Sequence, residues 1–321
     1  KSVVAVVLRE DTEMLDEVVV VGFGTQKKVN LTGSVGIASA KDLESRPVMN
    51  ATQALQGVVP GLQITTNSGE LDKNMNINIR GAGTIGDGSS ASPLILIDGM
   101  EGDINTVNPQ DIENISILKD AASSSIYGSR APFGVILITT KKGKAGKATI
   151  NYNNSFRFSS PMNMPQMMDS YTFANYFNAA SVNSSWGTQF SDETMRKMLD
   201  FQAAGGSSKG GMDKNEDRGV WEPDIYIKGY ANTDWFSEIY KDNNFSQEHN
   251  MSISGGSEKI SYYASLGYLS QSGALRHGND GLKRYNVTGK INAELTSWLD
   301  FGYNIRFVRT DNDRPSAFTS G

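Results

Sequence analysis

Few side chains in this chain have the types and spacing that catalysis requires. The 321-residue sequence contains no cysteine and two histidines, His249 and His277. Thiol nucleophiles and cysteine metal sites are therefore excluded, and these two imidazoles are the candidate general bases. Neither is accompanied by a nucleophile elbow or by paired carboxylates in a catalytic arrangement. We therefore assign no catalytic residue and expect a protein that is not an enzyme.

Two motifs resemble ligand sites, but each lacks a required part. Residues 81–86 match the dinucleotide fingerprint G-x-G-x-x-G, yet the Gly-, Ser- and Pro-rich segment that follows cannot start the helix that would receive a pyrophosphate. Asp213, Asn215 and Asp217 have the D-x-N-x-D spacing of a calcium loop, but Arg218 stands where that loop needs glycine. We therefore expect no cofactor, and calcium stays an alternative to a solvated acidic loop.

A run of four valines, Val18–Val21, follows the acidic residues Asp16 and Glu17 and precedes glycines. Consecutive β-branched residues strongly favour an extended strand. Two interpretations stay open. The run is either a buried strand of this chain or a detached peptide that adds itself as an edge strand to the sheet of a partner.

The segments around these motifs predict a compact mixed α/β domain. Three short apolar runs, Leu94–Ile97, 115–118 and Val135–Thr140, are separated by turn residues and one small-residue helix. Each run is too short to span a membrane and too apolar for a surface, which is typical of buried strands. Asn50 is expected to cap a short helix over residues 51–56.

From about residue 147, apolar and polar residues alternate along extended segments, at 148–158, 245–254, 259–269, 284–295 and 299–307. Such alternation is typical of a transmembrane β-barrel wall, with apolar side chains toward lipid and polar ones toward the lumen. The connections alternate long and short, as in outer-membrane barrels, which favours the barrel over a soluble β-sandwich. The long connection is expected to hold helices near 171–180 and 191–203.

Charge and apolar content narrow the possibilities further. The net charge of −5 argues against a nucleic-acid-binding protein, which needs a basic surface. No apolar run approaches the roughly 18 residues that a transmembrane helix needs.

Several long motifs resemble the SusC/RagA family of TonB-dependent outer-membrane transporters. In chain order they are LDEVVVVGFGTQKK, INIRGAG, PLILIDG, ISILKDAASSSIYGSRAPFGVILITTKKG and NTDWFSEIYKDNNFSQEHNMSISGGSEKISYYASLGYLSQSG. The resemblance implies an α+β plug domain followed by antiparallel transmembrane β-barrel strands. The family's barrel has about 22 strands, of which this chain would hold about five.

The resemblance also implies partners and a function. A TonB box, engaged in the periplasm by TonB with ExbB and ExbD, would be formed by Asp16, Glu17, Val18, Val19, Val20 and Val21. A SusD-like surface lipoprotein would form a lid. The whole protein would import an oligosaccharide or oligopeptide across the bacterial outer membrane, in contact with its lipid. A passive outer-membrane receptor without energy coupling is the alternative.

The resemblance further divides the chain. Residues 1–9 would end an upstream carboxypeptidase-regulatory-like domain, 10–28 would hold the TonB box and a linker, and 29–146 would form the plug. Residues 147–321 would form the first barrel strands, with a long extracellular loop at 159–242.

Several exposed side chains have two interpretations each. Arg80 and Arg130 of the plug are candidates for pairing with carboxylates on the barrel wall, and pairing inside the plug is the alternative. Trp186, Trp221 and Trp235 of the long loop are candidates for stacking on sugar rings or contacting the lid, and ordinary loop packing is the alternative. The residues that bind the substrate stay unknown at this stage.

Overall fold

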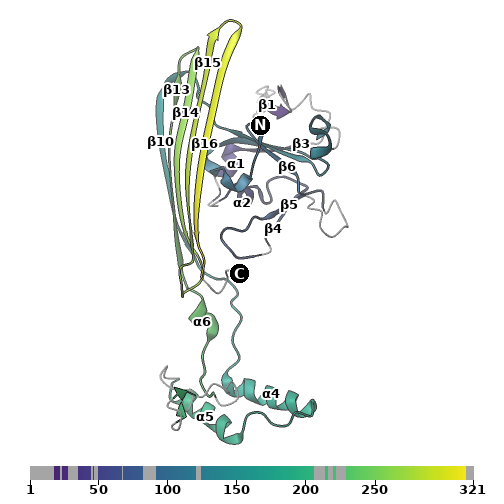
Figure 1. The fold of residues 1–321 in the computed structure, drawn as a ribbon, viewed down its shortest axis with the longest axis vertical. Coiled ribbons are helices and arrows are strands. Elements are labelled where there is room, and N and C mark those ends of the chain that lie inside the picture. Colours follow the sequence, from purple (N-terminus) through teal and green to yellow (C-terminus); the bar gives the residue numbers. More distant parts are fainter. Residues whose placement is uncertain are drawn as a thin grey trace, which may run out of the picture. The chain divides into compact units, whose positions relative to one another are not determined.

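The computed structural model describes residues 18–21, 24–27, 35–44, 46, 50–66, 68–81, 92–120, 124–205, 214–215, 220–221 and 229–315. Figure 1 shows them as a ribbon. The chain divides into two compact units. The first comprises Lys1–Arg157 with Ser246–Ser272 and Gly281–Asp313, and the second comprises Phe158–Phe245, Gly273–Asp280 and Arg314–Gly321.

The plug is built on a five-stranded mixed sheet with the strand order β3-β8-β9-β6-β7. Strand β6 (Leu94–Ile97) runs parallel to β9 (Val135–Thr140), which pairs antiparallel with β8 (Ile112–Leu118). The edges are β3 (Val35–Ser39) and β7 (Met100–Glu101). The three apolar runs that the sequence singled out therefore lie in the three inner strands of this sheet.

Both faces of this sheet are buried, which explains why its strands read as continuous apolar runs. On β9, Ile136 and Ile138 join the main core, while Val135 and Leu137 join a second cluster on the opposite face. Helices α1 (Ala40–Glu44) and α2 (Ala51–Leu55) complete the main core with Leu43, Ala51, Ala54 and Leu55.

The start of α2 confirms the predicted cap. The Asn50 side-chain oxygen accepts a hydrogen bond of 2.7 Å from the backbone nitrogen of Gln53. That bond satisfies one of the donors left free at a helix N-terminus. Two small hairpins lie outside the main sheet, one of β1 (Val18–Val21) with β2 (Gly24–Lys27) and one of β4 (Leu62–Thr65) with β5 (Asn76–Ile79).

The wall is a five-stranded sheet in chain order, β10-β13-β14-β15-β16 (Figure 1). Its strands are β10 (Gly146–Ser159), β13 (Asn244–Gly256), β14 (Ile260–Ser272), β15 (Gly281–Thr296) and β16 (Leu299–Asp313). From β13 to β16 the neighbouring strands pair antiparallel. Each predicted alternating segment corresponds to one of these strands.

The wall is polar where it is buried and apolar where it is exposed. On β15 the side chains of Arg284, Asn286, Thr288 and Lys290 are buried, each 4–6% exposed. Their apolar neighbours are open: Val287 is 41% exposed and Ile291 is 46% exposed. A water-soluble sheet has the reverse pattern, so the predicted barrel-type wall is confirmed and the soluble β-sandwich is not.

The second unit contains the predicted helices of the long connection. Helix α4 (Ser170–Asn183) and helix α5 (Asp192–Ala203) share a small core with buried Phe190 and Met198, and a short α6 (Trp235–Ile239) follows. No helix in the described part of the chain is long and apolar enough to cross a membrane.

Candidate functional site

The plug contacts the inward face of the wall through polar groups, and two side-chain clusters dominate these contacts. The first, which we name the Asp98 cluster, consists of Asp98, Thr140, Lys290 and Asn304. The second, the Asp111 cluster, consists of Asp111, Tyr263, Ser265 and Thr288. In each cluster a plug carboxylate receives hydrogen bonds from wall side chains.

Asp98 lies in the turn between β6 and β7, with a backbone φ of +50° that Asp and Asn tolerate better than most residues. Its carboxylate lies 2.9 Å from Lys290 Nζ on β15. Within the plug it accepts hydrogen bonds from the Thr140 backbone nitrogen at 2.9 Å and hydroxyl at 2.7 Å. Asn304 Nδ2 on β16 donates a further hydrogen bond of 3.1 Å to the Asp98 carboxylate.

The ion pair of this cluster is withdrawn from water. The side chains of Asp98 and Lys290 are only 12% and 5% exposed. Burial raises the pKa of the Asp98 carboxyl, but the Lys290 ammonium and the hydrogen bonds from Thr140 outweigh burial and hold the pKa below its ordinary value. Asp98 is therefore ionised at neutral pH, and the pair couples the plug to the wall electrostatically.

Asp111 is a buried carboxylate held by hydroxyl groups. It ends a 3-10 turn, η3 (Pro109–Asp111), which is capped by Asn108 and begins with Pro109. Tyr263 and Ser265 of β14 donate hydrogen bonds of 2.8 and 2.7 Å to its two oxygens, and Thr288 of β15 lies 3.3 Å away. These donors come from two neighbouring wall strands, so one plug carboxylate bridges them.

Wall side chains also bind the plug main chain. Arg284 donates to the carbonyl of Asn105 at 2.6 Å, and Asn286 donates to that of Thr106 at 2.8 Å. Gly267 of β14 permits close approach, because a Cβ there would lie 2.6 Å from the side-chain nitrogen of Asn108. Polar contacts therefore dominate the interface, and buried Leu269 and Leu282 add an apolar part to its inward face.

The plug arginines that the sequence singled out do not pair with the described wall strands. Arg80 lies 2.5 Å from Asp120, and Arg130 pairs with Glu101, both inside the plug. The structure therefore corrects the expected wall pairing to the alternative. The ion pair that does cross the interface has the opposite arrangement of charges from the expected one. The plug supplies the carboxylate, Asp98, and the wall supplies the cation, Lys290.

Sequence reasoning missed both clusters. Asp98 looked like an ordinary Asp-Gly turn residue. The signal that could have found Lys290 was a cation at a lumen-facing position of a barrel-type strand, because such a charge needs a partner when it is buried.

The valine run forms a strand that pairs within the chain itself, in a two-stranded antiparallel sheet. In its register, Val18 lies opposite Lys27, Val19 opposite Gln26, Val20 opposite Thr25 and Val21 opposite Gly24. One edge of β1 is therefore used by β2, and the addition of this strand to the sheet of a partner stays a prediction. The run is not a strand of the plug's five-stranded sheet.

The predicted TonB box is described only in its valine part. Asp16 and Glu17 lie outside the described residues, and Val18, Val19, Val20 and Val21 are described by their backbone alone. Their role in binding TonB therefore stays a prediction.

The other sequence candidates are only partly described. Asp213, Asp217 and residues 82–86 lie outside the described residues, and Asn215 is described by its backbone alone. In the part of the chain that the structure describes, no group of His, Asp and Glu could hold a metal ion. The Trp221 side chain lies outside the description, while Trp186 and Trp235 are 76% and 58% exposed.

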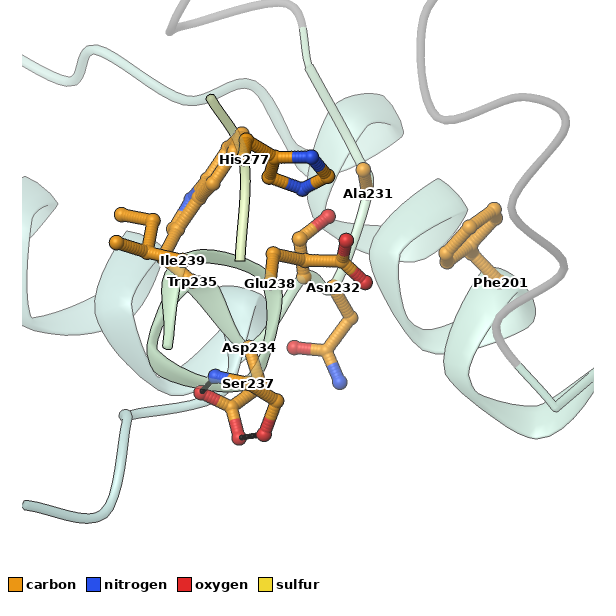
Figure 2. A pocket seen from close by; sticks show the side chains of 10 residues that line it. Phe201, Ala231, Asn232, Asp234, Trp235, Ser237, Glu238, Ile239 and His277 are labelled. Carbon is orange, nitrogen blue, oxygen red and sulfur yellow. Dashed lines mark hydrogen bonds between the residues drawn. The ribbon is translucent and has the colours of Figure 1, made fainter. Parts of the chain in front are cut away.

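The two histidines lie in different surroundings. The Tyr152 hydroxyl lies 2.7 Å from His249 Nδ1, within an aromatic row that also includes Tyr268. His277 lines a pocket of about 460 Å³ in the second unit. Figure 2 shows Trp235 and Phe201 at opposite sides of this pocket. The pocket combines aromatic rings, an imidazole and carboxylates, a set that suits binding of a polar ligand.

Comparison with known proteins places these features in a family. The model of the TonB-dependent receptor plug domain matches residues 27–135. TonB-dependent receptor P3 of Formosa agariphila is 33% identical over 97% of this chain and 26% of its own length. TonB-dependent receptor SusC of Bacteroides thetaiotaomicron is 32% identical over 96% of this chain and 27% of its own length. The chain belongs to the TonB-dependent receptors of the SusC and RagA type.

Solved structures agree with this family. The RagAB peptide importer in its open-open state superposes with a TM-score of 0.73 and 31% identity, over 93% of this chain and 32% of that chain. The chain thus spans about a quarter of the length of the curated relatives that it matches. TonB-dependent receptors are outer-membrane proteins, so the exposed apolar side chains of β15 face lipid and its buried polar side chains face the lumen.

Proposed function

We propose that this chain is the plug and part of the wall of an active importer. The whole protein would carry an oligosaccharide or oligopeptide across the outer membrane, together with a SusD-like lipoprotein lid and TonB. The observation that carries the proposal is the plug held on a lumen-facing wall by polar contacts, in a chain of the SusC and RagA type. The similarity to the RagAB peptide importer supports this substrate class.

A polar interface suits a plug that must move. Undocking an apolar interface would expose apolar surface at about 25 cal/mol per Å². Hydrogen bonds to water can instead replace those that Asp111, Arg284 and Asn286 make across this interface, so the net cost of each is about 1–3 kcal/mol. The described contacts therefore hold the plug in a defined position on the wall, while the free energy needed to move it away stays moderate.

Force would enter through Val18–Val21. A strand in a two-stranded sheet has a second edge, where main-chain hydrogen bonds can join a strand of TonB. We expect the pull on this strand to displace or partly unfold the plug once substrate has bound outside.

The test is Val19→Pro in the full-length receptor, with Val19→Ile as the matched control. Proline removes one main-chain donor and blocks strand addition, whereas isoleucine keeps both the donor and the strand propensity. Substrate uptake should be lost in the proline variant at unchanged surface expression, and kept in the isoleucine variant. Uptake by the proline variant at the wild-type rate would refute energy coupling and favour a passive receptor.

A further inference from the structure

The inward face of the wall carries an excess of positive charge beneath the plug. On β15 it includes Arg284 and Lys290, and on β16 it includes Arg306, whose backbone pairs with that of Thr288. Over this described stretch, the paired inward positions of β14 and β16 contain no carboxylate. We name Arg284, Lys290 and Arg306 the cationic stripe.

The inward carboxylate of β13 is already paired. Glu248 of β13 lies 2.7 Å from Arg157 of β10, and their side chains are 8% and 14% exposed. Glu248 also acts electrostatically on Arg284. Lys290 and Arg306, by contrast, have no carboxylate at the neighbouring wall positions with which their backbones pair.

In the docked state the plug supplies the negative charge. Asp98 pairs with Lys290, and Asp111 is buried next to Thr288, between the members of the stripe. Asp103 of the plug and Arg284 line the same small cavity of about 240 Å³. Plug carboxylates therefore lie close to Lys290 and Arg284, the two members of the stripe on β15.

Docking alone does not account for Arg306. It is half-buried and makes no ion pair among the described residues, and a Cβ placed on Gly102 of the plug would lie 3.6 Å from its guanidinium. A cation that the docked plug does not neutralise remains available to another anion.

We propose that the cationic stripe binds carboxylate groups of the substrate when the plug moves away. Displacing the plug removes Asp98 from Lys290 and opens this part of the lumen to water. Lys290 and Arg306 then lie on neighbouring strands as lumen-facing cations without a plug carboxylate, and such a concentration of one sign of charge attracts anions. A carboxylate-bearing substrate takes the place of the plug carboxylates, so this sector of the lumen selects acidic oligomers. This inference rests on the proposed plug displacement.

The test uses a single reporter thiol. The 321 residues of this chain contain no cysteine, and any cysteine elsewhere in the full-length receptor is first replaced by serine. Thr288→Cys is introduced into the full-length receptor, which is expressed with its lid in cells with and without TonB. The probes are two methanethiosulfonates of similar size, the anionic sulfonatoethyl and the cationic trimethylammonium-ethyl reagent. The measured quantity is the ratio of the anionic to the cationic labelling rate, divided by the same ratio for free cysteine in the same buffer. This quotient reports the local electrostatic potential, because a change in solvent access affects both reagents equally.

We expect labelling to be faster with TonB and the anionic reagent to be favoured roughly tenfold over free cysteine. Lys290 lies about 7 Å along the strand from position 288. With salt screening, Lys290→Gln or Arg306→Gln should each lower the ratio about threefold. Lys283→Gln, on the outward side of the same strand, should leave the ratio unchanged and serves as the control.

Two results would overturn the inference in distinguishable ways. TonB-dependent labelling with the free-cysteine ratio, unaltered by Lys290→Gln, would remove the anion selectivity and leave the proposed importer standing. Labelling at equal rates with and without TonB would overturn plug displacement, and the inference with it. If Thr288→Cys fails to reach the surface, Asn286→Cys on the same inward face provides the reporter.

Discussion

Replacing Asp98 by asparagine removes one charge and one hydrogen-bond acceptor from the plug side of the interface, because Asp98 Oδ2 also accepts from the Thr140 hydroxyl and from Asn304. The backbone φ of +50° at this turn suits Asn as well as Asp, so the variant adds no backbone strain. Asn keeps one oxygen that can accept the Thr140 backbone hydrogen bond, now 2.9 Å long. Its amide nitrogen cannot accept from the Lys290 ammonium, which then stays buried without its counterion.

The expected cost follows from the burial of the pair. Removing one partner of a buried ion pair typically costs about 3–5 kcal/mol. Lys290 retains its 3.1 Å hydrogen bond to the Thr140 carbonyl, and lumen water can reach the site after a small movement. We therefore expect the docked state to lose about 2–3 kcal/mol, which is a roughly 30- to 150-fold shift toward undocking.

The assay is the labelling rate of the Thr288→Cys reporter in cells that lack TonB, since this position is buried while the plug is docked. Glu101→Gln is the matched control. It breaks the Arg130–Glu101 pair of the same hairpin, whose side chains are 65% and 61% exposed, so its effect should stay within about twofold. A labelling rate for Asp98→Asn within twofold of that control would refute the docking role of the pair. Adding Lys290→Gln to Asp98→Asn should restore part of the loss, because no unpaired buried charge remains.

Three further outcomes are expected. Tyr263→Phe removes one of the hydroxyl donors to Asp111 and should weaken docking by about 1–2 kcal/mol, measured by the same labelling rate; a rate equal to that of wild type would contradict it. The docked state lowers the pKa of Asp98, so ionised Asp98 stabilises the docked plug at pH values above the ordinary pKa of about 3.9. This stabilisation is lost as the pH falls below that value. The urea midpoint of plug unfolding should therefore fall below about pH 4, and Asp98→Asn should remove that part of the pH dependence. Gly143→Ala should lower the melting temperature, because the added Cβ would clash with the backbone oxygen of Tyr262 on β14. The control Gly69→Ala, with no atom within 4 Å of the added Cβ, should leave the melting temperature unchanged. Equal melting temperatures for the two variants would contradict the clash at Gly143.

Local chemistry and periodicity were enough to predict much of the architecture. The alternation along β15 predicts one polar and one apolar face, because successive side chains of a strand point to opposite sides. The continuous apolar run of β9 predicts a strand buried on both faces. The cap at Asn50 depends on a bond that spans three residues, so it too could be predicted from the sequence.

The tertiary structure decided which polar groups meet across the interface. Tyr263 and Asp111 are 152 positions apart, and Asn304 and Asp98 are 206 apart, so no local pattern links them. The partners of Arg80 and Arg130 could not be predicted from the sequence either, because carboxylates were available both in the plug and on the wall. Only the folded chain brings Arg130 to Glu101. Periodicity determines the face on which a side chain lies, but the choice of partner across that face depends on how two separately folded sheets pack.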